Sequence, residues 1–159
     1  MGYAYSRTAL FDGYQTGSRD GRPVAPLLGD LKDYDGGASD FSFGPLSFLL
    51  AYSDHVVAYV FTPVDLENCL CDIYWLVRND AVEGKDYDVE ELVWLWDITT
   101  HADKRIIVNN WKGVNSRYYE PGPFSGMESL ERRYVEWILQ QLSGESPTRG
   151  SDKLSVASG

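Results

Sequence analysis

Cysteine and histidine are scarce in this sequence of 159 residues, which contains two of each. The cysteines, Cys69 and Cys71, are separated by one residue in a stretch where apolar residues alternate. In a strand, two such residues share a face with Cα atoms about 7 Å apart, near the upper limit for a disulfide. We therefore interpret the pair as small hydrophobic core residues rather than a disulfide.

Basic residues are also few, because 14 Lys and Arg stand against 24 Asp and Glu, for a formal net charge of -10. Sequence-independent binding to nucleic acid requires clustered Lys and Arg that displace counterions. The charge balance therefore argues against nucleic acid as a partner.

Long apolar runs are absent too, since none approaches the roughly 18 residues of a membrane span. The first residues, MGYAYSRTALFDGY, lack the basic and apolar blocks of a signal peptide. We expect no membrane partner and a cytoplasmic location.

The composition is that of a globular protein, with 43% hydrophobic and 14% aromatic residues. A chain of this length buries roughly 70% of the surface that it exposes when unfolded. We predict one domain over residues 1–143. The small, polar residues 144–159, GESPTRGSDKLSVASG, are predicted to form a disordered tail.

Strand patterns occupy the middle of the chain. Residues 1–45 are rich in Gly, Asp and Pro and are predicted to form loops between short extended pieces, with clear strand signals from Leu46. Residues 55–62 are almost all apolar, and residues 68–78 alternate with the odd-numbered face toward the core. The two segments are predicted to pair as an antiparallel hairpin.

Helical patterns follow the strands. Asp88 and Glu91 have the spacing of a capping box. Thr99 and Thr100 predict an interruption, with a second helix from about 101 to 112 and a stop at Gly113.

A last helix is predicted to begin at Ser125, with Glu128 three residues further on. Strands followed by helices predict an α+β domain, with the helices packed on one face of an antiparallel sheet.

The most informative stretch is WLWDITTHADKRIIVNNWKGVNSRYYEPG, residues 94–122. It carries Trp-Asp-Ile-Thr at 96–99, then Asp103, then Gly113, and continues into Pro-Gly-Pro at 121–123. This ordered combination resembles the last iron-ligand segment of the Rieske non-haem iron oxygenases, also called ring-hydroxylating oxygenase α subunits. The residues around Asp103 are closest to the branch that oxidises choline, betaine and carnitine. Residues 16–30 also resemble this family, but more loosely.

The resemblance implies a helix-grip catalytic domain, in which a curved antiparallel sheet packs against C-terminal helices, here as a partial domain. It implies a monooxygenase or dioxygenase, an oxidoreductase that uses O2 and a mononuclear non-haem Fe(II), as in the catabolism of aromatic compounds. It also implies a reductase or ferredoxin partner and a homotrimer or a multiple of it.

Much of that apparatus is missing from these residues. A Rieske 2Fe-2S cluster needs two Cys and two His in separated pairs, whereas no Cys here lies near either His. In the family, both iron-binding His residues precede the region that this chain resembles. We therefore expect a Rieske and His-bearing segment, or a separate chain, to supply them. The isolated chain is predicted to be inactive.

Asp103 has two interpretations. It stands three residues after Thr100, as in a capping box at the start of a helix. It also shares a helical face with Ile106 and Ile107, where a carboxylate must be paired or bound to metal. The resemblance favours the carboxylate ligand of a two-His, one-carboxylate iron site.

The histidines do not complete that site in our interpretation. His55 lies in a strand pattern and is predicted to have an ordinary core or sheet role. His101 precedes Asp103 by two residues, which places the two side chains on different sides of a helix. We predict a surface or cap histidine.

Aromatic residues are numerous enough to line a cavity. The predicted pocket-lining residues are Tyr74, Trp75, Trp94, Trp96 and Asn110, although aromatics at such spacings are more often simply core. No residue is assigned as catalytic or cofactor-binding, and Asp103 is the one metal ligand that the resemblance implies. The alternative function is a non-catalytic helix-grip module, derived from that family, which binds a ligand or a partner subunit.

Overall fold

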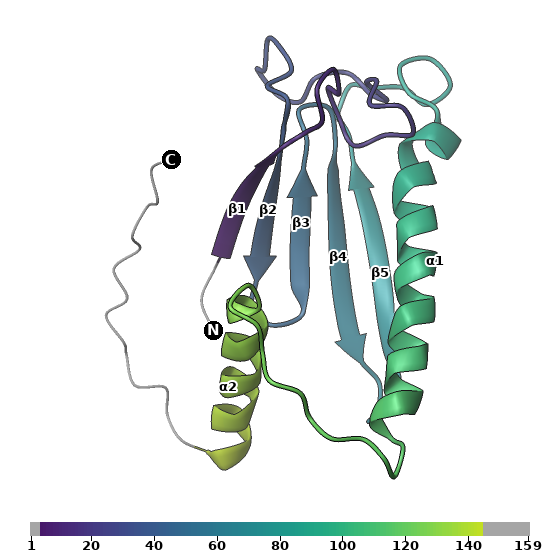
Figure 1. The fold of residues 1–159 in the computed structure, drawn as a ribbon. Coiled ribbons are helices and arrows are strands. Elements are labelled where there is room, and N and C mark those ends of the chain that lie inside the picture. Colours follow the sequence, from purple (N-terminus) through teal and green to yellow (C-terminus); the bar gives the residue numbers. More distant parts are fainter. Residues whose placement is uncertain (1–3, 145–159) are drawn as a thin grey trace. The chain divides into compact units, whose positions relative to one another are not determined.

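Five strands and two helices make up the part of the chain that the structure, a computed structural model, describes, residues 4–144 (Figure 1). They fall into two units, one ending at Glu120 and the other beginning at Pro121. In chain order the elements are β1 (Ala4–Ala9), β2 (Gly37–Phe43), β3 (Ser47–Ala51), β4 (Val56–Pro63), β5 (Cys69–Leu76), α1 (Val89–Val114) and α2 (Ser129–Ser143).

The first unit holds a single antiparallel sheet in which each strand pairs with the next along the sequence. Short turns join β2, β3, β4 and β5 in this order, whereas residues 10–36 connect β1 to β2. Between β4 and β5 the Asp65 carboxylate accepts the backbone N–H groups of Glu67 and Asn68, both at 2.8 Å. Such an Asx turn reverses the chain over few residues. The predicted hairpin is confirmed, with Val57 opposite Trp75.

The two faces of this sheet differ in cover. On one face Val57 and Tyr59 are buried, and α1 lies against it. The other face exposes Phe41, Tyr74 and Leu76. Because side chains alternate along a strand, the residues of β5 that share the face of Val57 are the odd-numbered ones. The prediction that the odd-numbered side chains of β5 lie on the core face of the sheet is therefore confirmed.

The N-terminal third contains more sheet than the sequence predicts. β1 and β2 both lie before Leu46, where loops between short extended pieces were expected, and they pair from Ala4 opposite Ser42 to Ala9 opposite Gly37. β2 reads GASDFSF, a composition poor in strand formers. Pairing on both sides satisfies its backbone, and such context overrides a weak intrinsic preference.

The interpretation of the cysteines as core residues is wrong. Cys69 and Cys71 are free and exposed. They lie on β5, which has one neighbouring strand among the described residues. Alternation along a strand determines which face a side chain occupies, but not whether another element covers that end of the face.

α1 is one continuous helix of 26 residues, so the predicted interruption at Thr99 is wrong. The Thr99 hydroxyl donates to the carbonyl oxygen of Leu95 at 2.9 Å and to that of Trp96 at 3.3 Å. This bonding to the preceding turn lets a threonine remain inside a helix. The predicted cap is confirmed, because Asp88 accepts the N–H of Glu91 at 3.1 Å.

The second unit contains α2, which begins at Ser129 rather than at the predicted Ser125. The Glu128 carboxylate accepts the backbone N–H of Ser125 at 2.6 Å. This bond closes a turn before the helix. The serine and the glutamate of the Ser-x-x-Glu pattern do contact each other, but the serine lies outside the helix. The helix ends at Gly144, whose φ of +72° suits glycine.

The predicted α+β class is confirmed by the five-stranded antiparallel sheet and the two helices. Apart from Gly144, the predicted disordered tail lies outside the described residues. None of the helices described is long and apolar enough to cross a membrane.

Candidate functional site

The middle of α1 is joined to the sheet through two hydroxyl groups. The Tyr59 hydroxyl oxygen on β4 lies 2.8 Å from the Thr100 Oγ1 on α1. Tyr59 is 6% exposed. A polar group buried among rings requires a partner, and Thr100 supplies it. This contact positions the following turn of α1 relative to the sheet.

Five aromatic residues surround that contact: Phe48, Tyr52, Tyr59, Phe61 and Trp96, here called the aromatic cluster. The Phe48 and Tyr59 rings stack at 4.7 Å, and Trp96 meets the Tyr59 ring nearly at right angles, at 6.4 Å. Each such pair adds about 0.5–1.5 kcal/mol beyond area burial. The cluster therefore holds α1 in a defined register on β3 and β4.

Asp103 lies one turn beyond Thr100 on the same side of α1, because residues three apart on a helix are neighbours. Burial raises the pKa of the Tyr59 hydroxyl, and the nearby Cys71 thiol and Asp103 carboxylate raise it further, against the lowering effect of the Thr100 hydrogen bond. Asp103 is exposed, and no hydrogen bond or ion pair joins it to another residue of the described chain. Its carboxylate oxygens are therefore available to a ligand.

The capping interpretation of Asp103 is wrong. Thr100 lies in the middle of α1, and its hydroxyl bonds Tyr59 rather than a backbone N–H group. Every N–H at this position already belongs to the helix, so no unpaired donor is left for Asp103 to stabilise.

Neither histidine is placed beside Asp103 as a second ligand. His55 is fully buried, with its Nδ1 2.9 Å from the Asp54 carboxylate and its ring 5.0 Å from that of Tyr52. His101 is exposed and directs Nε2 toward Asp97, at 3.5 Å. Both predicted roles, a core histidine and a surface histidine, are confirmed.

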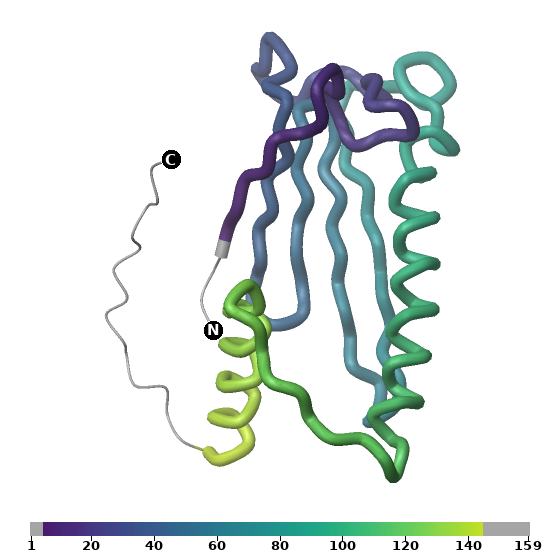
Figure 2. Tube along the Cα trace, viewed as in Figure 1, coloured from purple at the N-terminus to yellow at the C-terminus, as the bar shows by residue number. Residues whose placement is uncertain are grey.

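Asp54 is the centre of a buried network that belongs to the scaffold. Its carboxylate accepts the Thr16 hydroxyl at 2.5 Å and the Val24 N–H at 3.0 Å, besides its contact with His55. Burial alone would raise the pKa of Asp54, but the bonds and charge of His55, with those other donors, outweigh burial and lower it. The network fastens the 10–36 loop to the start of β4, and Figure 2 shows this loop at the same end of the sheet.

The pKa of the neighbouring Tyr52 hydroxyl is affected by the same buried carboxylate. Burial, the nearby carboxylates of Asp40 and Asp54, and Tyr59 raise the pKa of Tyr52 to about 12. Gly17 packs against this ring so closely that a Cβ atom would lie 2.5 Å from it. A glycine is therefore required where the 10–36 loop crosses the aromatic cluster.

The predicted pocket-lining residues are only partly brought together. Trp75 and Trp96 each have a buried indole N–H without a hydrogen-bond partner among the described residues. Tyr74 lies on the opposite face of β5 and is 54% exposed, and Asn110 is exposed. Trp94 packs under the Arg19 guanidinium, at 4.3 Å. Their role in a pocket stays a prediction.

Sequence reasoning missed Tyr59, Tyr52 and Thr100. Tyr59 could have been found, because its hydroxyl is a polar group within residues 55–62, which are almost all apolar. Thr100 could not have been found from the sequence, because the two neighbouring threonines indicate a helix break. Only the contact with Tyr59 shows which group its hydroxyl binds.

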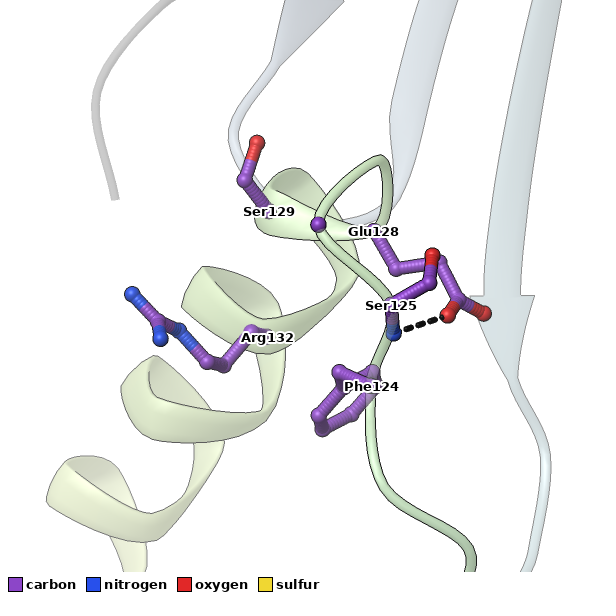
Figure 3. Close-up of a pocket in the computed structure, with 6 residues that line it drawn as sticks. Phe124, Ser125, Glu128, Ser129 and Arg132 are labelled. Carbon is purple, nitrogen blue, oxygen red and sulfur yellow. Dashed lines mark hydrogen bonds between the residues drawn. The ribbon is translucent and has the colours of Figure 1, made fainter.

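A separate cavity of about 260 Å³ lies in the second unit, at the start of α2. Figure 3 shows the Ser125–Glu128 bond on one side of it and Arg132 on the other. Arg132 forms an ion pair with Glu136, at 3.5 Å. The cavity is lined by Phe124, Ser125, Gly126, Glu128, Ser129 and Arg132. It holds no residue of the predicted iron site.

An iron site of the two-His, one-carboxylate type needs three convergent protein ligands. Asp103 fits the carboxylate position, as an unpaired oxygen donor beside the aromatic cluster. Among the residues described, no three His, Cys, Asp or Glu side chains gather as a metal site. The described residues therefore fit the carboxylate part of such a site and bring no histidine beside it.

Comparison with known proteins identifies the family of the chain. Residues 4–144 match the family described as ring hydroxylating alpha subunit (catalytic domain), and the chain belongs to this family. It is a Rieske oxygenase catalytic-domain segment, as the 94–122 stretch indicates.

Two relatives show the branch. The chain is 35% identical over 146 residues to the glycine betaine monooxygenase oxygenase subunit of Pseudomonas aeruginosa (strain UCBPP-PA14), an alignment that covers 88% of this chain and 34% of the relative. It is 34% identical over 149 residues to the protein of the same name from Chromohalobacter salexigens, covering 90% and 34%. The chain thus spans about a third of the length of these relatives.

Proposed function

We propose that this chain is the carboxylate-bearing part of a Rieske-type monooxygenase that oxidises a quaternary amine of the glycine betaine class, with Asp103 as an iron ligand. The observation that carries the proposal is the unpaired Asp103 carboxylate on the sheet-facing side of α1, one turn beyond the Tyr59–Thr100 contact. A hard oxygen donor in such a place suits ferrous iron.

The residues of this chain have positioning roles in that function. The aromatic cluster and the Tyr59–Thr100 bond hold α1, and so keep the Asp103 carboxylate at a constant distance from β4. Iron, when bound, supplies the activation of O2. Rigid support of a metal ligand matters because a small displacement of the ligand weakens both affinity and activity.

The substrate class rests on the relatives, which are named for glycine betaine. Aromatic rings attract a quaternary ammonium group through their electron-rich faces. The aromatic side chains beside Asp103 are consistent with a substrate of this charge. Dioxygenation of an aromatic compound is the less favoured reaction, because no relative named here carries it.

The remaining apparatus is proposed to come from outside the described residues. A 2Fe-2S cluster and two imidazole ligands belong to the intact enzyme, together with a reductase or ferredoxin that delivers electrons. We further propose a trimeric assembly and a cytoplasmic location. Without these parts the isolated chain is inactive as an oxygenase.

The experiment compares Asp103→Asn with Asp97→Asn in a full-length polypeptide that contains this sequence. Both residues are aspartates of α1, but Asp97 is paired with His101 and lies on another side of the helix. We expect Asp103→Asn to lose mononuclear iron and betaine oxidation, while the visible absorption of the Rieske cluster is unchanged. Asp97→Asn is expected to keep all three.

Full activity and iron content in the Asp103→Asn enzyme would overturn the assignment and favour the non-catalytic module. Loss of activity with iron retained would leave Asp103 near the reaction but not as the ligand.

A further inference from the structure

The two cysteines form a pair on an open part of the sheet. Both are free and exposed. They are alternate residues of β5, with Cys69 opposite Pro63 and Cys71 opposite Phe61 of β4. Because successive side chains of a strand point to opposite faces, these two thiols leave the strand on the same face.

Their spacing favours a shared ligand over a direct bond. Two residues along a strand separate the Cα atoms by about 6.4–6.8 Å. That separation is at the upper end of the range for a disulfide. Side chains that run parallel from such positions can both reach one ion placed between the two sulfur atoms.

The Cys69 thiol is close enough to affect Cys71. Burial raises the pKa of the Cys71 thiol, and the neighbouring Cys69 and the Asp72 carboxylate raise it further. A thiol with a raised pKa is protonated near neutral pH and is a poor nucleophile. A metal ion that binds it must displace the proton, which makes the affinity dependent on pH.

The surroundings restrict which ion can bind. No third His, Cys, Asp or Glu joins the pair among the residues that the structure describes. A structural zinc site needs four protein ligands, and so does not fit. Thiolates select soft ions, and Cu(I) accepts coordination by two sulfur atoms.

We propose that Cys69 and Cys71 form a two-thiolate site for a soft ion of the Cu(I) class. On binding, each S–H bond gives its proton to solvent and each sulfur donates an electron pair to the ion, with no change of oxidation state. The site does not depend on the iron ligand or on the proposed oxygenase reaction.

The experiment is an anaerobic titration of the 159-residue chain with Cu(I) in competition with a coloured Cu(I) chelator. Because the chain has no other cysteine, binding and thiol loss both report this pair. We expect one ion per chain, tighter binding as pH rises, and protection of both thiols from maleimide.

Cys69→Ser and Cys71→Ser are each expected to weaken binding by at least about tenfold, because a single thiolate remains. The matched control is Asp72→Asn, which changes the residue between them on the opposite face and is expected to retain the site. Far-UV circular dichroism checks that each variant is folded.

Equal affinity in either serine variant and the parent would overturn the proposal. Two thiols that stay fully reactive toward maleimide with Cu(I) present would overturn it as well.

Discussion

At the scale of single residues, two aspartates of the chain have different surroundings. Asp54 belongs to a buried hydrogen-bond network, and Asp103 does not. Asp54 is fully buried and accepts from Thr16 and Val24 besides contacting His55. Asp103 is exposed and has no such partner in the described chain. The same residue type therefore serves stability at Asp54 and is proposed to bind a ligand at Asp103, because burial and hydrogen-bond donors differ between the two places.

Replacing Asp54 by Asn is expected to lower the free energy of unfolding by about 2–4 kcal/mol, since donors to a buried charged acceptor lose their partner. The measurement is urea denaturation at neutral pH. Asp30→Asn, at an exposed position without a hydrogen bond or ion pair in the described chain, is expected to change stability by less than about 0.5 kcal/mol. Equal losses in the two variants would contradict the role of the network.

The lowered pKa of Asp54 gives that contribution a pH dependence. Burial works against the shift, and the bonds and charge of His55 with the other donors produce it. A carboxyl whose pKa is lower in the folded state contributes fully above its unfolded pKa of about 3.9 and loses its contribution as pH falls through the folded value. The difference in stability between the parent and Asp54→Asn is expected to shrink below about pH 4. A difference that stays constant down to pH 2 would be inconsistent with this account.

At the scale of elements, the contact between α1 and β4 determines where the candidate ligand lies. α1 has a helix cap at Asp88 and no break at Thr99, so it carries Asp103 as part of one rigid helix. A polar bond crosses from this helix to β4 between the Tyr59 and Thr100 hydroxyls. The position of Asp103 therefore depends on that bond and on the surrounding rings.

A double-mutant cycle with Tyr59→Phe and Thr100→Val tests this contact. Each single change is expected to cost about 1–2 kcal/mol, because it leaves a hydroxyl of the partner without its bond. The double mutant is expected to be more stable than the sum predicts, by about 0.5–1.5 kcal/mol. Thermal or urea unfolding measures all four proteins, and strict additivity would show that the two hydroxyls do not interact.

At the scale of the whole molecule, the chain is a catalytic-domain segment of its family. It matches its family over residues 4–144 but covers about a third of the relatives' length. The described residues provide a sheet, the helix that bears Asp103, and a shorter helix in a second unit. One carboxylate is too few ligands to hold ferrous iron firmly.

The isolated chain is therefore expected to bind iron weakly and to show no oxygenase activity. Elemental analysis after anaerobic loading with Fe(II) and removal of free metal measures this directly. The Asp103→Asn chain, treated in the same way, shows how much iron adheres elsewhere. Stoichiometric iron retained by the parent chain alone would revive His101 as a second ligand.

Local sequence was sufficient for features that depend on neighbours along the chain. The Asp88 cap, the β4–β5 hairpin and the covered odd-numbered face follow from residue order, because turns, caps and alternation act over a few residues. The order of residues around Asp103 was also enough to identify the family.

Only the tertiary structure decided how those elements are used. Thr99 and Thr100 read as a break, but bonds to the preceding turn and to Tyr59 keep α1 continuous and exclude Asp103 as a cap. Cys69 and Cys71 were predicted to be core residues, yet both are exposed in the part of the chain that the structure describes. The physical reason is the same in each case. Burial and side-chain partners come from residues distant in sequence, and alternation or propensity along one segment does not identify those residues.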